Sequence, residues 1–408
     1  MIGFAAFLRA NAAFLFAGGL LAFSSSFGQT FFISIFAGQI MEAFSLSNGQ
    51  WGLIYAAGTA ASAAVMLWSG ALTDRFRVRN LGLFVLFGLS AASLIMAINP
   101  WAWFLPVAIF LLRLTGQGMT SHIATVAMAR WFVATRGRAL SIAGAGFAIG
   151  EALLPLLFVW AMTFAGWRTL WLVAAGFVLL VVPVMHRLLR RERTPQSHAE
   201  ADNTTGMDNR HWTRAQMLRH PLFWCMFPAI LGPAAFVTAL FFQQVYLAEI
   251  KGWSHVALVA LFPLYTGIST VFMLVAGWAI DRMGTARLMP FFQLPIAIGF
   301  LIMAQAESLG GAALAFALIA VTSGANATLP AAFWAEFYGT RNIGGIKAIA
   351  TATMVLGSAI GPAITGLLID AGVDFPTQMF GIAVWFVIAS MLLSVGVMRA
   401  HGSLSRAA

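Results

Sequence analysis

Long apolar runs make up most of this 408-residue chain. A segment in lipid must satisfy its own backbone hydrogen bonds, and about 20 apolar residues in an α-helix cross the hydrocarbon core. Charged residues are only 9 % of the chain, whereas soluble domains carry about 25 %. The sequence therefore predicts an all-α integral membrane protein with twelve transmembrane helices. The predicted spans are residues 10–37, 50–72, 81–99, 101–130, 139–164, 168–187, 221–248, 257–279, 287–305, 311–337, 345–369 and 376–399.

The cations lie almost entirely in alternate loops. Twenty of the 23 Lys and Arg residues fall on one side of the predicted spans, and only Arg168 and Lys251 fall in loops on the other. The positive-inside rule then places both termini in the cytoplasm. The net charge of +10 is thus a topology signal, and no nucleic-acid partner is expected. We expect a monomeric, multi-pass protein of a bacterial inner membrane, surrounded by the lipid bilayer.

The chain consists of two similar halves. The sequence Gly70-Ala71-Leu72-Thr73-Asp74-Arg75 follows the second span, and Gly277-Trp278-Ala279-Ile280-Asp281-Arg282 follows the eighth with the same spacing. The one long polar stretch lies between the halves. We predict two pseudo-symmetric six-helix bundles, residues 1–188 and 221–408, joined by a cytoplasmic linker at 189–220. Two such bundles suggest a transporter, because a site between them can open to one side and then to the other.

These motifs resemble the major facilitator superfamily. Its loop motif, Gly-x3-Asp-Arg-x-Gly-x-Arg-Arg, is similar to residues 70–79, with Arg77 in place of the second glycine. Arg113-Leu114-Thr115-Gly116-Gln117-Gly118 resembles the motif of span 4, and Gly166-Trp167-Arg168 resembles the start of span 6. Residues 25–32, 130–132 and 136–139 look most like the oxalate/formate antiporter and monocarboxylate transporter branch.

The resemblance implies a secondary active transporter that moves a small organic anion, a carboxylate, by alternating access, with a proton as the coupling ion in symport. An alternative is a proton-driven efflux pump for amphipathic compounds. Drug/proton antiporters of the superfamily carry Gly-Pro in span 5, where this chain has Leu154-Pro155. This difference favours the organic anion. Glycine pairs Gly146/Gly150 and Gly357/Gly361 predict close helix packing.

Two charged residues fall deep within the predicted spans. Arg113 and Glu151 each lie roughly 18 Å from a membrane edge by helix rise, and an intramembrane charge is a functional candidate. We expect them to pair, with Arg113 exchanging its partner for a substrate carboxylate and Glu151 carrying the coupled proton. A static ion pair that fixes spans 4 and 5 is the alternative. His122 lies roughly 13 Å further along span 4 and is a second candidate for proton coupling.

Polar side chains in the remaining apolar spans are candidates for substrate contacts, although each could instead bridge two helices. The predicted substrate-binding residues are Gln29, Tyr55, Arg113, Gln117, Gln244, Tyr265 and Asn326. The loop residues Asp74, Arg75, Asp281 and Arg282 are too shallow to reach a substrate. The family resemblance implies that they form an inner-side latch, and a carboxylate in such a loop can face a helix N-terminus. These four residues are the predicted gating set.

The residue types give no sign of an enzyme, a cofactor or a metal centre. The four histidines at 186, 198, 211 and 220 are too far apart in the sequence for a ligand pattern, and Cys225 is the only cysteine. No catalytic cluster is recognisable. We therefore expect a protein whose ligands are a small organic anion and protons.

Overall fold

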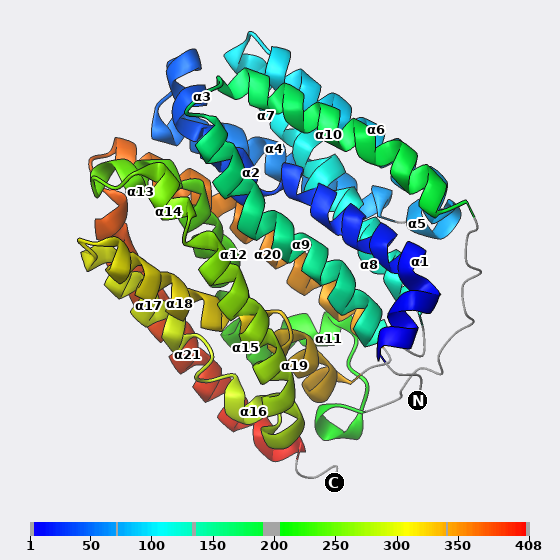
Figure 1. Ribbon diagram of the computed structural model, residues 1–408. Helices are drawn as coiled ribbons and strands as arrows, with labels where there is room; N and C mark the ends of the chain where they lie inside the picture. Colours follow the sequence, from blue (N-terminus) through cyan, green and yellow to red (C-terminus); the bar gives the residue numbers. More distant parts are fainter. Residues whose placement is uncertain (1–3, 71, 133–135, 191–204, 340–341, 405–408) are drawn as a thin grey trace. The chain divides into compact units, whose positions relative to one another are not determined.

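The computed structural model describes residues 4–70, 72–132, 136–190, 205–339 and 342–404, and within these ranges every regular element is a helix (Figure 1). Eleven helical segments of the described chain are long and apolar enough to cross a membrane. This confirms the predicted all-α membrane class. The chain divides into two compact units, Met1–Ala199 (unit 1) and Glu200–Ala408 (unit 2).

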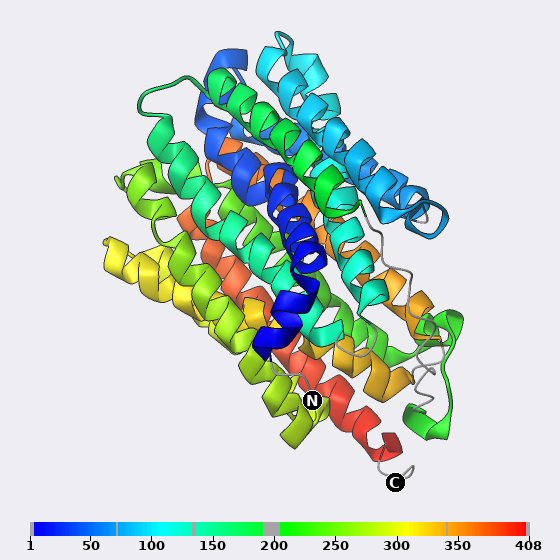
Figure 2. The same cartoon turned by 45° about the vertical axis from the view of Figure 1, so that its right-hand side comes forward.

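Unit 1 is a bundle in which α1 packs along α9, α4 along α7, and α6 along α10. In Figure 2, as in Figure 1, the dark-blue α1 lies beside the teal α9, and the blue α6 lies beside the green α10. Ser47 begins α4 with a capping box, because its hydroxyl accepts from the backbone N–H of Gln50 while the Gln50 side chain accepts from that of Ser47. The elements are α1 (Phe4–Ser24), η1 (Ser25–Gly28), α2 (Thr30–Ile33), η2 (Ser34–Phe36), α3 (Ala37–Phe44), α4 (Asn48–Ser69), α5 (Leu72–Arg75), α6 (Val78–Ile98), η3 (Ala102–Phe104), α7 (Leu105–Leu112), the π-helix η4 (Arg113–Thr120), α8 (Ser121–Trp131), α9 (Arg136–Ala161) and α10 (Trp167–Leu188).

Unit 2 repeats this packing with the equivalent spans. Here α12 packs along α20, α15 along α18, and α17 along α21. The repeat read from the two Asp-Arg loops thus extends to the three-dimensional arrangement within each unit. The elements are η6 (Met207–Asn209), α11 (Arg214–Arg219), α12 (Pro221–Phe242), α13 (Gln244–Ile250), α14 (His255–Val259), α15 (Phe262–Met283), α16 (Thr285–Leu288), α17 (Leu294–Gln305), α18 (Leu309–Asn326), α19 (Leu329–Tyr338), α20 (Ile343–Asp370) and α21 (Phe375–Leu404).

Glycines permit the closest of these helix contacts. A Cβ atom at Gly146 of α9 would collide with the backbone of Gly19 in α1, and one at Gly361 of α20 would collide with the backbone of Ala235 in α12. The predicted role of the glycine pairs in helix packing is confirmed at these positions. Because both contacts join equivalent helices, they also reflect the internal repeat.

The predicted ninth span, residues 287–305, is interrupted. It comprises the short α16, a turn and the 12-residue α17, so no single helix spans it. Pro290 and Pro295 lack the backbone N–H that a continuous helix needs. The hydroxyl of Thr322 on α18 stabilises the break, since it accepts from the N–H of Ile296 at 3.1 Å and donates to the carbonyl of Phe292 at 2.9 Å.

Much of the predicted linker is folded onto unit 2. Within residues 205–219, which we call the strap, the side chains of Met207, Trp212 and Met217 are buried. The N–H of Trp212 donates to the carbonyl of Tyr338 at 3.0 Å, and Asn342 Nδ2 donates to the carbonyl of Trp212 at 3.1 Å. Residues 205–219 of the predicted cytoplasmic linker are therefore packed on unit 2, because three large apolar side chains gain burial there.

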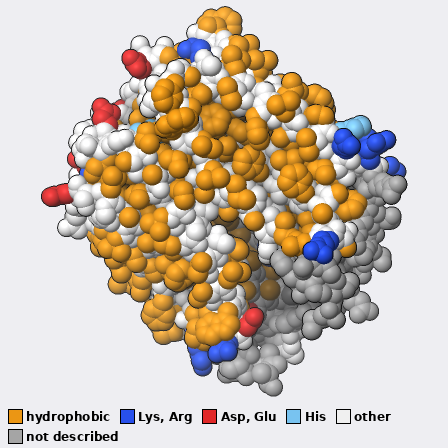
Figure 3. All heavy atoms as spheres, in the orientation of Figure 1, with side chains coloured by type: hydrophobic (Ala, Val, Ile, Leu, Met, Phe, Trp, Pro, Cys, Tyr) orange, Lys and Arg blue, Asp and Glu red, His pale blue; other side chains and the backbone are white. Residues whose placement is uncertain are grey.

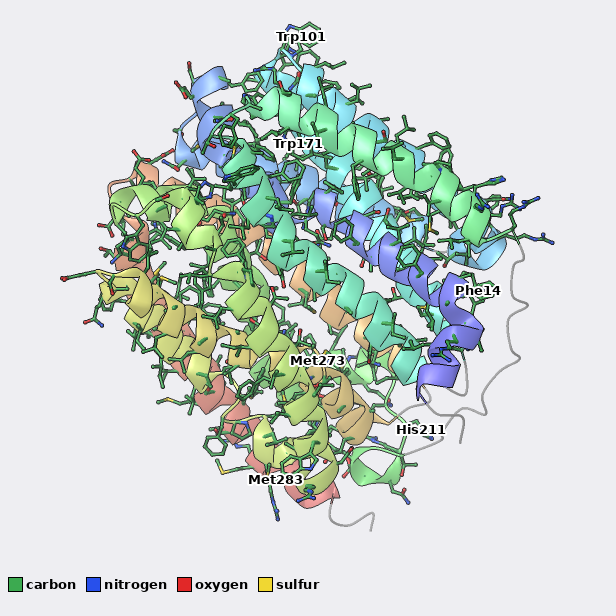
Figure 4. The ribbon with its side chains drawn as sticks, viewed as in Figure 1. Phe14, Trp101, Trp171, His211, Met273 and Met283 are labelled. Atoms are coloured by element: carbon green, nitrogen blue, oxygen red, sulfur yellow. The ribbon has the colours of Figure 1, made fainter. Side chains whose placement is uncertain are left out.

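His220 follows the strap directly and precedes α12. Nδ1 of His220 accepts from the backbone N–H of Leu222 at 3.3 Å and so caps α12. Partial burial of the ring lowers the pKa of His220, and Arg210 lowers it further while Asp208 opposes the shift. The direction of this shift favours the neutral ring, whose Nδ1 can accept the hydrogen bond. Figure 4 shows that His211 of the strap lies at the same end of unit 2 as Met283.

Candidate functional site

The first span is not one continuous helix. Helix α1 ends at Ser24, a short 3-10 turn follows, and Gln29 has extended backbone (φ −86°, ψ 155°) before α2 begins. The hydroxyl of Ser24 donates to the carbonyl of Leu20 at 2.8 Å, and that of Ser25 to the carbonyl of Ala22 at 2.7 Å. Such side-chain bonds compete with the helical ladder, and the break follows them directly.

A cluster of aromatic rings holds the broken segment in place. Phe32 lies 5.0 Å from Phe27, 4.8 Å from Phe158 of α9 and 5.4 Å from Trp171 of α10, measured between ring centroids. Phe36 lies 5.2 Å from Trp171. Trp171 lies inside unit 1 in Figure 4, well away from the labelled Trp101 at one end. The three contacts of Phe32 are edge-to-face, and together these packed rings fix the path of the chain on both sides of the break.

The fourth span is irregular where it meets this break. Residues Arg113–Thr120 form a π-helix, and the Thr120 hydroxyl donates to the carbonyl five residues earlier, Thr115, at 2.6 Å. Gly116 packs directly on Gly28, because a Cβ atom on either glycine would lie within 2.7 Å of the other's Cα. Single π-helical turns are rare and are frequent at functional sites.

Arg113 projects from the π-helix onto the break. Its side chain is only 2 % exposed. Nη1 donates to the Thr30 hydroxyl at 3.3 Å and to the Gly28 carbonyl at 3.4 Å. The Thr30 hydroxyl lies 2.5 Å from the Tyr55 hydroxyl, and the Arg113 Cζ atom lies 5.4 Å from the centre of the Tyr55 ring. A guanidinium is thus surrounded by hydroxyls, a carbonyl and an aromatic face.

These interactions leave the cation poorly satisfied. Charge-assisted hydrogen bonds are usually about 2.7–2.9 Å long, so the two recorded for Arg113 are weak. Its Nε atom is buried with no hydrogen-bond partner in the described part of the protein. The partners recorded for Arg113 within this part do not include Glu151, the carboxylate expected to pair with it. Glu151 is half-buried on α9.

Four of the predicted substrate-binding residues gather here. Arg113 and Tyr55 are in contact, Gln29 is buried at the break, and Gln117 follows Gly116 where that glycine packs on Gly28. Thr30, which contacts both Arg113 and Tyr55, was not among the predicted substrate-binding residues. His122, half-buried on α8, lies instead near Gly70 at the end of α4.

The other three predicted contacts lie in unit 2 and are dispersed. The Tyr265 hydroxyl donates to Ser323 Oγ at 2.9 Å, which joins α15 to α18. Gln244 donates from Nε2 to the carbonyl of Phe241 at 2.9 Å, and its Oε1 atom lies 3.3 Å from Nε2 of His255. Asn326 is half-buried at the end of α18. The contact between His255 and Gln244 was not predicted, because His255 lies at the edge of an apolar run and its sequence position is typical of a loop.

The predicted gating residues fall in two groups. Asp74 and Arg75 lie in α5, and their side chains lie outside the described part of the structure. Asp281 and Arg282 are exposed at the end of α15, where the Arg282 Cζ atom lies 4.4 Å from the Trp278 ring centre. The carboxylate that faces the start of α16 belongs to Glu336, which accepts from the backbone N–H of Thr285 at 3.0 Å and from its hydroxyl at 2.7 Å.

Replacing Glu336 should therefore destabilise unit 2. In Glu336→Ala both donors of the fully buried Thr285 lose their acceptor, and buried unsatisfied groups cost about 1–3 kcal/mol. We expect a lower unfolding temperature of the purified protein. Glu307→Ala, which removes an exposed carboxylate, is the matched control and should unfold as the wild type does. Equal stability of the two variants would show that the Glu336 contact is unimportant.

Comparison with known proteins agrees with this architecture. The sequence matches the Major Facilitator Superfamily over residues 18–362. It is also 34 % identical over 164 residues to the 3-(3-hydroxy-phenyl)propionate transporter of Escherichia coli (strain K12), a match that spans 38 % of this chain and only 38 % of that relative's length.

Solved structures show the same fold over nearly the whole chain. A bacterial homologue of the human lysosomal transporter Spinster, in an inward-facing and unoccupied conformation, has a TM-score of 0.75 and 17 % sequence identity, with 96 % of this chain and 98 % of that chain covered. The nucleoside transporter NupG has a TM-score of 0.69 and 12 % identity, with 95 % and 99 % covered. At these identities the likeness concerns the fold alone. The family match over residues 18–362 shows that the chain belongs to the Major Facilitator Superfamily of transport proteins.

Proposed function

We propose that this transporter moves a small organic acid, in its carboxylate form, across the bacterial inner membrane with a proton as co-substrate. The observation that carries the proposal is the buried Arg113, whose recorded partners are neutral. A cation at membrane depth is costly unless an anion or strong acceptors compensate it. A carboxylate could accept two short, charge-assisted hydrogen bonds from the guanidinium. The relative named for 3-(3-hydroxy-phenyl)propionate supports the same substrate class, since that compound is a carboxylic acid.

The surroundings of Arg113 suit an aromatic or short aliphatic acid. The Tyr55 ring and the Thr30 hydroxyl lie beside the guanidinium, and Gln29 is buried next to Thr30 in the sequence. These groups could orient a carboxylate while the apolar part of the substrate contacts apolar side chains. A buried cation disfavours a cationic amphiphile, which argues against the alternative of an efflux pump for such compounds.

The remaining assignments belong to the same proposal. Gln117, Gln244, Tyr265 and Asn326 are proposed to contact the substrate during the cycle, and Asp74, Arg75, Asp281 and Arg282 to act in gating. The distribution of cations supports cytoplasmic termini. Glu151 and His122 are the proposed proton carriers, because they are the acidic and imidazole side chains that lie within the predicted fourth and fifth spans.

The proton assignment has a specific test. Glu151→Gln removes a titratable group but keeps the shape of the side chain. In proteoliposomes loaded with 3-(3-hydroxyphenyl)propionate, we expect this variant to retain substrate exchange and to lose uphill accumulation driven by an imposed pH gradient. His122→Gln provides the comparison for the second candidate. Normal gradient-driven accumulation by Glu151→Gln would refute its role in coupling.

The alternative of a static pair makes a different prediction. If Glu151 only compensates Arg113, each single neutral variant should be destabilised, because one buried charge is left unpaired. The double variant Arg113→Gln/Glu151→Gln should then recover both stability and transport. Under our proposal the double variant stays inactive, since it lacks both the carboxylate site and the proton carrier.

A further inference from the structure

A group of basic side chains gathers at one end of unit 1. Helices α6 and α10 pack together, and this contact brings Arg79, near the start of α6, to His186, in the last turn of α10. Nη2 of Arg79 lies 2.9 Å from Nε2 and 3.2 Å from Nδ1 of His186. Arg187 and Arg190 are exposed beside them in the sequence. We call these four residues the basic patch; Figure 3 shows blue and pale-blue side chains together at the right-hand margin, where α10 ends.

The basic patch has no internal counter-charge. Within the described chain, Arg79, Arg187 and Arg190 have no recorded ion pair, and the ion pair that is recorded joins Arg210 to Asp208 in unit 2. Arg79 instead donates to an imidazole. Several cations held together without an acid favour the binding of an anion with more than one acceptor oxygen, such as a phosphate group.

Apolar side chains continue from the basic patch along the same two helices. On α6, Phe84 is 75 % exposed and Phe87 is 52 % exposed. On α10, Leu180 is 70 % exposed, and Phe177 and Val184 are exposed as well. The two helices run in opposite directions from the Arg79–His186 contact, so Phe84 and Leu180 both lie roughly 8 Å further into the membrane. This depth is suited to acyl chains.

We propose that the basic patch binds the phosphate group of an anionic phospholipid, whose acyl chains lie along the exposed apolar side chains of α6 and α10. Phosphatidylglycerol and cardiolipin have this chemistry. A basic site directly above lipid-facing helices is typical of such recognition. Free phosphate could bind the basic patch but would not contact the apolar side chains of α6 and α10. A zwitterionic lipid carries a cationic group in its headgroup, which the arginines would repel.

The test uses the full-length protein in detergent. Native mass spectrometry would count bound lipids after titration with phosphatidylglycerol, cardiolipin or phosphatidylcholine, and unfolding temperatures would be recorded with each lipid and with inorganic phosphate. We expect retention of the two anionic lipids only. In Arg79→Gln/Arg187→Gln/Arg190→Gln, the affinity for them should fall about fivefold for each arginine, roughly one hundredfold in total.

Two further variants keep the result interpretable. Arg214→Gln/Arg219→Gln/Arg287→Gln removes three exposed cations from unit 2 and should keep wild-type lipid affinity. The double variant Arg187→Gln/Arg190→Gln replaces the triple variant if the latter fails to fold, because neither side chain has a recorded contact within the described part of the protein. Its affinity for the anionic lipids should fall about 25-fold. Equal lipid retention by the patch and control variants would overturn the proposal. Two other results would also overturn it. One is retention of phosphatidylcholine to the same extent as phosphatidylglycerol. The other is a rise in unfolding temperature with inorganic phosphate that equals the rise with the anionic lipids.

Discussion

Arg113→Gln is expected to abolish high-affinity binding of the carboxylate substrate while leaving the empty protein folded. Removing one partner of a buried, hydrogen-bonded charge pair costs about 2–5 kcal/mol, which corresponds to an affinity loss of roughly 30-fold to several thousand-fold. The neutral glutamine ends two bonds short of Nη1, so the two weak hydrogen bonds of Arg113 are lost, while the Thr30 hydroxyl keeps the Tyr55 hydroxyl as its partner. The unliganded variant should unfold at the wild-type temperature or slightly above it, because an isolated buried cation has been removed.

The measurement is the rise in unfolding temperature caused by 3-(3-hydroxyphenyl)propionate and by a panel of small carboxylates. Arg168→Gln is a suitable control, since Arg168 lies at the start of α10, where it donates to the Asn99 carbonyl at 3.1 Å. This control should keep the ligand-induced rise. A purely structural role for Arg113 predicts the opposite pattern, with an unstable empty protein whose residual folded fraction still binds the acid.

Adding a Cβ atom where the irregular first and fourth spans meet should impair transport as strongly as Arg113→Gln does. In Gly116→Ala the new methyl group would lie 2.6 Å from Gly28 Cα and 2.7 Å from its nitrogen, and both of these are backbone atoms that cannot move aside alone. Either η1 or the π-helix must shift, which displaces Thr30 from Arg113. Overpacking of this kind typically costs about 1–3 kcal/mol, and displacement of the site should remove most transport.

The matched controls for this prediction are other glycines of unit 1. A Cβ atom at Gly144 of α9 or at Gly176 of α10 would have no neighbour within 4 Å. Alanine at these helical positions should preserve or slightly raise stability, because it favours the helix. Initial rates of uptake and unfolding temperatures would be compared for all three variants. Wild-type uptake by Gly116→Ala would show that the close contact at the break is dispensable.

The helical class and the internal repeat were predictable because they depend on composition averaged over many residues. A window of about 20 residues detects an apolar helix whatever its neighbours are. The same averaging conceals the breaks. The predicted span 10–37 contains the extended residue Gln29, and the predicted span 287–305 is divided near Pro290 and Pro295. The local signals were present as three consecutive serines and two closely spaced prolines.

The candidate site was predictable only in part, for the same reason. Arg113 stands out because charge is rare in this chain, but its actual partners depend on which helix faces the π-helix. Thr30 and Gly28 come from a span about 85 residues away. Glu336 and His255 look like ordinary loop or helix-end residues until folding brings Thr285 and Gln244 to them. The strap was missed because its buried residues are separated by polar ones without a helical period.

The folded strap has a consequence for producing the protein as two separate polypeptides. Division directly after His220 would leave Met207, Trp212 and Met217 on the first polypeptide, without the surface that buries them. The second polypeptide would begin at α12 and would lose the hydrogen bonds that Trp212 forms with Tyr338 and Asn342. Division ahead of Thr205 keeps the strap with unit 2, so the second polypeptide would retain this part of its own core.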